Sequence, residues 1–183
     1  MPCLYRRLLG PAFDSLPPTL RDFHDVERER FFQATFRVTR GRGFLRNLLC
    51  KFGGLPAAGD AVPMRLRVFP DGDAEHWQRR FGEHRLDSVQ RMQDGLMVES
   101  FGNGWRLGFR LHVEGPSLRL EMRRAWLLGV RLPLWLSPGG DGIEMGLDVG
   151  CAIVVRATAP LLGRIIQYEG LVTPLPEVTD LRV

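Results

Sequence analysis

Apolar and polar residues alternate with a period of two along most of the chain beyond residue 30, which is the pattern of half-buried β-strands. Between residues 105 and 113 the apolar residues stand at odd positions, and after the Gly-Pro pair at 115–116 they resume at even positions. A hairpin turn of two or four residues produces this change of parity. The pattern therefore predicts a hairpin that pairs Val113 with Leu118 and Phe109 with Met122.

Two further turn sequences predict hairpins by the same logic, and together these hairpins predict a curved antiparallel sheet with one apolar face. Residues 31–39 predict a first strand, residues 143–155 one long strand that bends at its glycines, and residues 165–173 a last strand. The expected pairs are Val98 with Phe109 around Asn103-Gly104, and Met64 with Arg79 and Leu66 with Trp77 around Asp71-Gly72.

Helical periodicity is confined to two places. Residues 1–30 predict an N-terminal helical segment in two pieces, divided at Gly10-Pro11. A single helix is predicted at about 43–54, where Phe44, Leu48 and Phe52 form one stripe. We expect this stripe to pack against one end of the sheet.

These elements predict a mainly β protein in which an antiparallel meander of about eight strands closes into a barrel or cup of the lipocalin or calycin kind. The alternative is an α+β helix-grip-like sheet wrapped around a long helix. The single long helix pattern comes early in the chain, which favours the barrel. We expect one domain over residues 1–183, with the helical segment at 1–30, the barrel-like body at 31–173 and an irregular tail at 174–183.

The apolar segment 126–136, WLLGVRLPLWL, breaks the alternation, and its proline argues against a central strand. Two interpretations remain open. The segment forms a core plug between strands, or it forms an apolar lip at the barrel mouth that contacts a hydrophobic ligand, a membrane or a partner.

Composition adds limits on function. The chain has 183 residues, 44% of them hydrophobic, and a formal net charge of +4. Its 25 basic residues include one lysine, Lys51, and lie scattered along the chain, so nucleic-acid binding is disfavoured. Three widely spaced cysteines indicate no disulfide framework. With no transmembrane span or signal-peptide pattern, we expect a cytoplasmic location.

Three stretches carry a family resemblance: LYRRLLGPAFDSLP at 4–17, RGRGFLRNLLCKFGGLP at 40–56 and RRAWLLGVRLPLWLSP at 123–138. Their order and spacing resemble the bacterial family catalogued as domain of unknown function number 4166. Similar domains also occur at the C-terminal end of saccharopine-dehydrogenase-like oxidoreductases, so the resemblance implies an oxidoreductase as a possible partner. It implies no catalytic residues, and the chain lacks a GxGxxG dinucleotide motif.

Candidate chemistry is sparse. His76, His84 and His112 fall on the polar phase of their strands, and His24 is expected to be a cap or surface residue. Glu99, Glu121, Glu144 and Asp148 are also expected to face outward. No GxSxG, HExxH or CxxC spacing occurs, so we predict no catalytic residue, no metal site and no cofactor.

The pattern therefore favours a non-enzymatic binding module that holds an apolar or amphipathic small molecule. The alternatives are a cavity enzyme of isomerase or cyclase type, and an interaction module that binds a redox enzyme through segment 126–136. Arg79, on an otherwise apolar phase, is hypothesised to bind a carboxylate or phosphate head. The candidate ligand-binding residues are Trp77, Arg79, Phe81, Ser100, Trp105, Phe109, Trp126 and Trp135.

Overall fold

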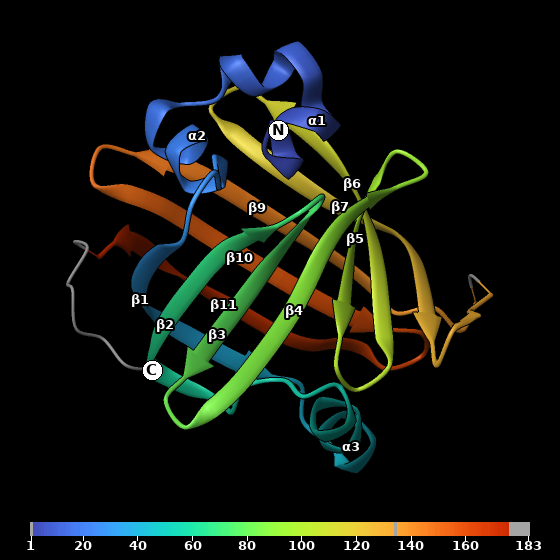
Figure 1. Cartoon of the computed structure of the whole chain (residues 1–183). Helices are drawn as coiled ribbons and strands as arrows, with labels where there is room; N and C mark the ends of the chain where they lie inside the picture. Colours follow the sequence, from blue (N-terminus) through green and yellow to red (C-terminus); the bar gives the residue numbers. More distant parts are fainter. Residues whose placement is uncertain (1, 134, 176–183) are drawn as a thin grey trace.

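The computed structural model describes residues 2–133 and 135–175 as a closed antiparallel barrel whose upper end carries the N-terminal helices (Figure 1). The helical elements are α1 (Leu4–Leu9), the 3₁₀-helix η1 (Gly10–Ser15), α2 (Pro18–His24) and α3 (Phe44–Phe52). The strands are β1 (Arg30–Arg40), β2 (Gly59–Asp71), β3 (Ala74–Phe81), β4 (His84–Gln93), β5 (Leu96–Phe101), β6 (Trp105–Glu114), β7 (Ser117–Leu127), β8 (Val130–Arg131), β9 (Gly139–Leu147), β10 (Gly150–Ala159) and β11 (Gly163–Pro174).

Within the described residues, ten strands pair in chain order from β1 to β7 and on through β9, β10 and β11, and β11 pairs back onto β1. The short β8 pairs only with the end of β7. The predicted up-and-down barrel is therefore confirmed, with ten strands where about eight were expected. Full closure leaves no exposed sheet edge in the barrel wall.

The hairpin predicted most clearly is confirmed, because Val113 lies opposite Leu118 and Phe109 opposite Met122. The β2–β3 hairpin differs in detail. Its turn lies at Gly72 and Asp73 rather than at Asp71-Gly72, so Met64 pairs with Phe81 instead of the expected Arg79. A shift of two residues leaves every side chain on the face that was predicted.

The β5–β6 pairing was predicted wrongly by one residue, which turns side chains to the opposite face. The turn has three residues, at 102–104, rather than the two of Asn103-Gly104. Val98 consequently lies opposite Gly108, and Glu99 lies opposite Leu107 on the face that lines the barrel interior. Glu99 thus points inward, and Ser100 lies on the other phase of the strand.

The long strand predicted at 143–155 is also wrong, since it is two strands joined by a two-residue turn at Asp148 and Val149. Leu147 pairs with Gly150 across this turn. The parity of inward positions reverses there, so Glu144 lies opposite the buried Ile153 and is itself buried, whereas Met145 is exposed. The expectation that Glu144 faces solvent is therefore wrong.

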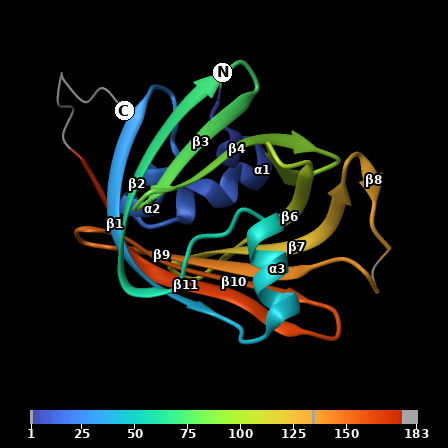
Figure 2. The same ribbon diagram turned by 90° about the horizontal axis from the view of Figure 1, so that it is seen from below.

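The two ends of the barrel are covered differently. At the closed end, α1, η1 and α2 lie over the opening and bury Phe13, Leu20 and Phe23 in the core. The ring of Phe23 contacts Phe32 and Trp77 edge-on, with centroids 4.9 and 5.6 Å away. At the opposite, open end, α3 is the one described helix, and it lies across the lower end of the barrel (Figure 2).

The apolar stripe of α3 does not pack against the barrel as expected. Phe44 is 78% exposed and Phe52 is 67% exposed, and the helix buries Cys50 against β11 instead. Because α3 has nine residues and contacts the sheet along a narrow strip, most of its apolar face remains uncovered.

Segment 126–136 likewise does not form a core plug. It contains the end of β7, a turn at Leu128 and Gly129, and β8. Leu128 and Val130 are exposed, as are Trp135 (75%) and Leu136; residue 134 lies outside the described residues. The structure therefore agrees with the second interpretation, an apolar lip at the end of the barrel.

Candidate functional site

The barrel encloses a cavity of about 280 Å³ that extends from the open end toward the N-terminal helices. Its mouth lies between α3 and the loop before β9, and its walls are mostly aliphatic and aromatic. The mouth is lined by Leu49, Leu55, Leu136, Pro138 and Pro160, and the walls by Leu86, Met97, Phe101, Trp105, Leu107, Phe109, Leu120, Met122, Val155 and Ile166.

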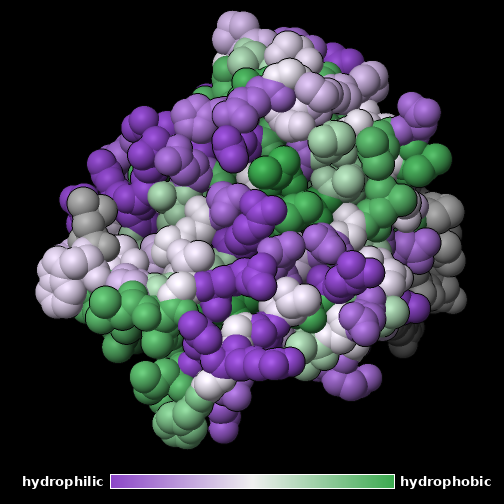
Figure 3. Space-filling view, turned by 180° about the vertical axis from the view of Figure 1, so that it is seen from behind, coloured by the Kyte–Doolittle hydropathy of each residue, from purple (hydrophilic) through white to green (hydrophobic). Residues whose placement is uncertain are grey.

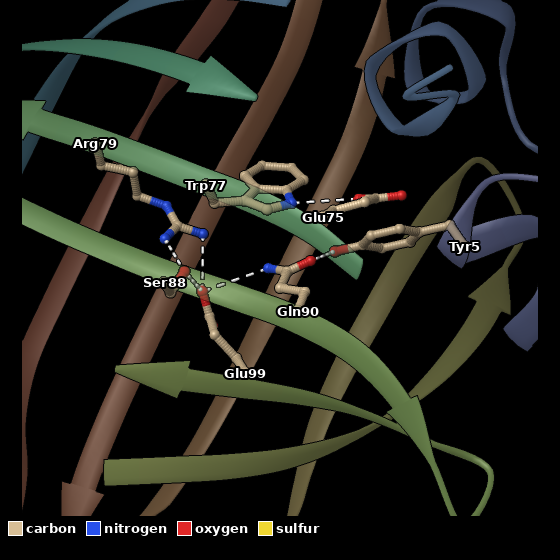
Figure 4. Close-up of polar contacts among 7 residues, drawn as sticks. All are labelled: Tyr5, Glu75, Trp77, Arg79, Ser88, Gln90 and Glu99. Carbon is tan, nitrogen blue, oxygen red and sulfur yellow. Dashed lines mark hydrogen bonds and ion pairs between the residues drawn. The ribbon is translucent and has the colours of Figure 1, made fainter. Parts of the chain in front are cut away.

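A polar cluster lies on one side of this cavity, where β3, β4 and β5 run side by side (Figure 4). Arg79 Nη2 donates to Glu99 Oε1 at 3.0 Å, and Arg79 Nη1 donates to Ser88 Oγ at 2.9 Å. Ser88 Oγ in turn donates to Glu99 Oε1 at 2.6 Å. Burial acts to lower the pKa of Arg79, but Glu99, Tyr168 and Tyr5 together outweigh it and raise the pKa, so the guanidinium stays charged.

The same carboxyl group receives a further bond from Gln90, whose Nε2 lies 3.4 Å from Glu99 Oε1. Gln90 Oε1 accepts from the hydroxyl of Tyr5, which reaches the cavity from α1 (3.3 Å). Among the described residues, every hydrogen bond to Glu99 falls on Oε1. Its Oε2 has no hydrogen-bond partner among the described residues.

A second carboxyl group in the cavity wall comes from β9. Glu144 Oε2 contacts Nε2 of His24, a fully buried residue at the end of α2. The His24 ring stacks on Tyr5 with centroids 3.8 Å apart, and its Nδ1 has no hydrogen-bond partner among the described residues. The expectation that His24 is a cap or surface residue is wrong, because α2 lies over the barrel opening and turns this side chain inward.

Burial disfavours the charged forms of the groups around this cluster. It raises the pKa of Tyr5 well above its usual range and that of Tyr168 to about 12, so both phenols remain protonated. Burial also raises the pKa of Glu75, although hydrogen bonds from the Leu4 backbone N–H and Trp77 Nε1 act in the opposite direction. Because the Tyr5 hydroxyl already donates to Gln90, Tyr168 is the phenol in the lining that can donate to a ligand.

The eight predicted ligand-binding residues are only partly brought together. Trp77, Arg79, Trp105 and Phe109 line the cavity. Phe81 is buried behind it, with its ring 5.8 Å from that of Tyr168. The other three, Ser100, Trp126 and Trp135, are not among the lining residues.

Each of these three residues has a structural reason for lying elsewhere. Ser100 is turned away by the one-residue shift of β5. Trp126 covers Gly108 on the other face of the sheet, where a Cβ on that glycine would meet the indole at 3.3 Å. Trp135 is exposed in the loop before β9.

Sequence reasoning missed the polar residues Tyr5, Gln90, Glu99, Glu144 and Tyr168. Glu99 and Glu144 were missed because the turns at 102–104 and 148–149 reverse the inward parity in ways the alternation alone does not show. Gly140 and Gly142 share the phase of Glu144 and lie opposite Ala157 and Val155. They also line the cavity, so they are the signal in the sequence that this phase faces the interior.

The remaining reactive groups offer no evident chemistry. All three cysteines are buried, and burial raises the pKa of Cys3 to about 11 and of Cys151 to about 12, which disfavours their thiolates. Over residues 2–133 and 135–175, no three His, Cys, Asp or Glu side chains form a group that could hold a metal ion. In the same residues, no helix is long and apolar enough to cross a membrane.

A closed ten-strand barrel with a mostly apolar cavity and an internal polar cluster places this chain in the architectural class of small antiparallel β-barrels. The chain belongs to the family described as Domain of unknown function (DUF4166), which matches residues 16–172. The match confirms the resemblance seen in the sequence. No curated protein matches the chain.

Proposed function

We propose that this protein is a non-enzymatic binding module that holds an apolar or amphipathic small molecule in the barrel cavity. The observation that carries the proposal is the cavity itself, about 280 Å³ with a mostly apolar lining and a polar cluster to one side. This size lies just below the roughly 300–1,000 Å³ typical of small-molecule sites, so the cavity suits a small ligand. The cavity argues against the alternative in which a solidly packed barrel serves only to display segment 126–136.

The polar cluster favours a ligand whose polar end donates hydrogen bonds. The hypothesis that Arg79 binds an anionic head is weakened, because Glu99 already pairs with its guanidinium at 3.0 Å. The cavity lining holds three carboxyl groups, from Glu99, Asp141 and Glu144, against two guanidinium groups, from Arg79 and Arg156. A hydroxyl or amino group can donate to the uncontacted Glu99 Oε2, whereas a carboxylate there would be repelled.

Competition among three matched probes tests this proposal. Nile red, a neutral apolar dye, first occupies the cavity, and 1-decanol, decylamine and decanoate then compete for it. We expect decanol and decylamine to displace the dye at concentrations at least about tenfold lower than decanoate requires. This ratio is the scale of one unfavourable charge contact. Glu99→Gln should reduce the advantage of decylamine, because the substitution removes the acceptor charge.

Leu161→Asp supplies the matched control, because Leu161 is fully exposed and outside the set of lining residues. It should leave all three displacement curves unchanged. The proposal fails if Nile red does not bind with one-to-one stoichiometry. Preferential displacement by decanoate would instead restore Arg79 as the group that recognises the ligand.

A second candidate is a cavity enzyme of isomerase or cyclase type, which the contact between His24 and Glu144 favours. A buried carboxyl group oriented by a histidine is an arrangement used for proton transfer. The test is to incubate the protein with the small molecule that co-purifies with it and to follow that molecule by chromatography. An isomer of unchanged mass that Glu144→Gln no longer produces would support the enzyme, and an unchanged molecule would exclude it.

A further inference from the structure

The open end of the barrel carries an unusual density of exposed apolar side chains around the cavity mouth. We call this surface the open-end rim. In Figure 3 its hydrophobic residues gather at the lower left, over α3 and the β10–β11 turn. The rim consists of Phe44, Leu45, Leu48, Leu49 and Phe52 of α3, Leu128 and Val130 around the β7–β8 turn, Trp135 and Leu136 before β9, and Leu161 in the β10–β11 turn.

Hydrogen bonds hold the separate segments of the rim together. Asn103 Nδ2, in the β5–β6 turn, donates to the carbonyl of Phe52 in α3 at 3.0 Å. The backbone N–H of Leu128 donates to the carbonyl of Gly104 in the same turn at 2.9 Å. From the other side of α3, Arg46 Nε donates to the carbonyl of Leu162 at 2.9 Å. The rim is therefore one connected surface rather than a set of independent loops.

Two rim residues occupy backbone conformations that disfavour their side chains. Leu128 has φ of 50° and Leu161 has φ of 63°, in the left-handed region where glycine or asparagine is usual. The closed-end hairpins have Gly72, Asp94 and Gly115 at such positions. Leu128 covers Gly104 but is 77% exposed, and Leu161 is fully exposed, so both present apolar surface to the outside of the protein.

Basic residues outnumber acidic ones around the rim, where the nearby acidic residues are Asp60, Glu83 and Asp141. Residues 40–59, which include α3, and residues 122–140, which include β8, contain Arg or Lys but no Asp or Glu. In the adjoining wall, Arg80 pairs across strands with both Arg65 and Arg85, and Arg85 also forms an ion pair with Asp87 at 2.9 Å. Glu83 is the one acidic residue in the turns of this end.

We propose that the open-end rim docks onto the surface of an anionic lipid bilayer, with the cavity mouth toward the lipid. Apolar and aromatic side chains surrounded by Arg and Lys are the composition of surfaces that lie in the membrane interface. A second copy of the chain fits this surface less well, because two rims facing each other would bring the same positive charges together. Docking would allow an apolar molecule to pass between the bilayer and the cavity without crossing water. This transfer rests on the proposed function, whereas the docking itself does not.

Vesicle flotation tests the docking. The full chain is mixed with vesicles of phosphatidylcholine alone or of phosphatidylcholine with phosphatidylserine, at low and at high salt. We expect flotation with the anionic vesicles at low salt, and weaker flotation at high salt because salt screens the attraction. Phe52→Asp should lower the partition coefficient at least about tenfold by removing one buried aromatic side chain. Lys51→Gln should lower it roughly fivefold.

Val149→Asp is the matched control, since Val149 is exposed to nearly the same degree as Phe52 (65% against 67%) but lies in a closed-end turn. It should float as the unmodified chain does. Nile red binding without vesicles should be the same in all of these variants, which separates failure of docking from failure of the cavity.

The docking proposal is overturned if the chain does not float with anionic vesicles, or if Val149→Asp weakens flotation as much as Phe52→Asp does. Equal flotation with neutral vesicles would overturn the role of anionic lipid. A stable dimer that Phe52→Asp dissociates would assign the rim to a second copy of the chain instead.

Discussion

The closed and open ends of this barrel use the same kinds of side chain for opposite purposes. At the closed end Phe13 and Phe23 are buried beneath the N-terminal helices, whereas at the open end Phe44 and Phe52 project from α3 into solvent. The closed-end hairpin turns contain Asp73, Asp94 and Asp148 and no basic residue, whereas α3 and the loops of the open end carry more basic than acidic residues. Apolar residues therefore stabilise the fold at one end and form an uncovered surface at the other.

The largest predicted effect is a contrast in stability between matched phenylalanines at the two ends. Phe13→Ala should lower the free energy of unfolding by about 3–5 kcal/mol, because it opens a void in a fully buried site. Phe52→Ala should change it by no more than about 0.5 kcal/mol. Chemical denaturation measures both, and a comparable loss in the two variants would contradict the contrast.

The next effect concerns the polar cluster between the two ends. Arg79→Met should destabilise the protein by about 3 kcal/mol, because Glu99 then loses its ion-pair partner inside the barrel. The double variant Arg79→Met with Glu99→Leu should recover most of this loss. A double-mutant cycle in denaturant measures the coupling, and additive losses would show that the pair does not interact.

A smaller, pH-dependent effect is expected from Glu75, near the closed end. Its folded pKa lies above the ordinary 4.5 because of burial, so the folded chain keeps this proton to a higher pH than the unfolded chain does. Its contribution to the free energy of unfolding therefore falls as pH rises from 4.5 through the raised value.

Glu75→Gln cannot lose a proton, so the stability of this variant relative to the unmodified chain should rise over the same pH interval. Denaturation at a series of pH values upward from 4.5 checks this, and a difference that stays constant with pH would contradict it.

The smallest predicted effect separates folding from surface function at the open end. Leu161→Gly should raise the free energy of unfolding by about 0.5–1 kcal/mol, because glycine accepts the φ of 63° without strain. The same variant should float less with anionic vesicles. Thermal unfolding and flotation give the two readouts, and loss of stability would show that Leu161 packs within the fold.

The sequence predicts the barrel well because its hydrophobic alternation is a direct consequence of one wall face being buried. It predicts the expected residue pairs of the β6–β7 hairpin correctly. The apolar residues change from odd positions, such as Val113, to even positions, such as Leu118, across Gly115-Pro116. It also places Trp77, Arg79 and Phe109 on the inward phase, and all three line the cavity.

The carboxyl groups of the cavity could not be predicted because they sit beside turns whose length the sequence leaves ambiguous. Asn103-Gly104 suggests two turn residues where three occur, and Asp148-Val149 lacks the glycine or asparagine of a typical two-residue turn. A wrong assignment at either turn exchanges the inner and outer faces of the neighbouring strand. Glu99 and Glu144 were therefore predicted to face solvent. The buried position of His24 depends on how α2 docks, which strand periodicity does not determine.

Native mass spectrometry of the protein purified from its own host tests the central claim most directly, with Gly142→Leu as the comparison. Gly142 lines the cavity, and an added Cβ there would meet Leu120 at an ordinary 3.4 Å, so leucine should fill space without disrupting the wall. We predict one small apolar molecule bound per unmodified chain and none bound to folded Gly142→Leu. A bare unmodified chain that also fails to bind Nile red, or equal occupancy of both proteins, would contradict the assignment of the cavity as a binding site.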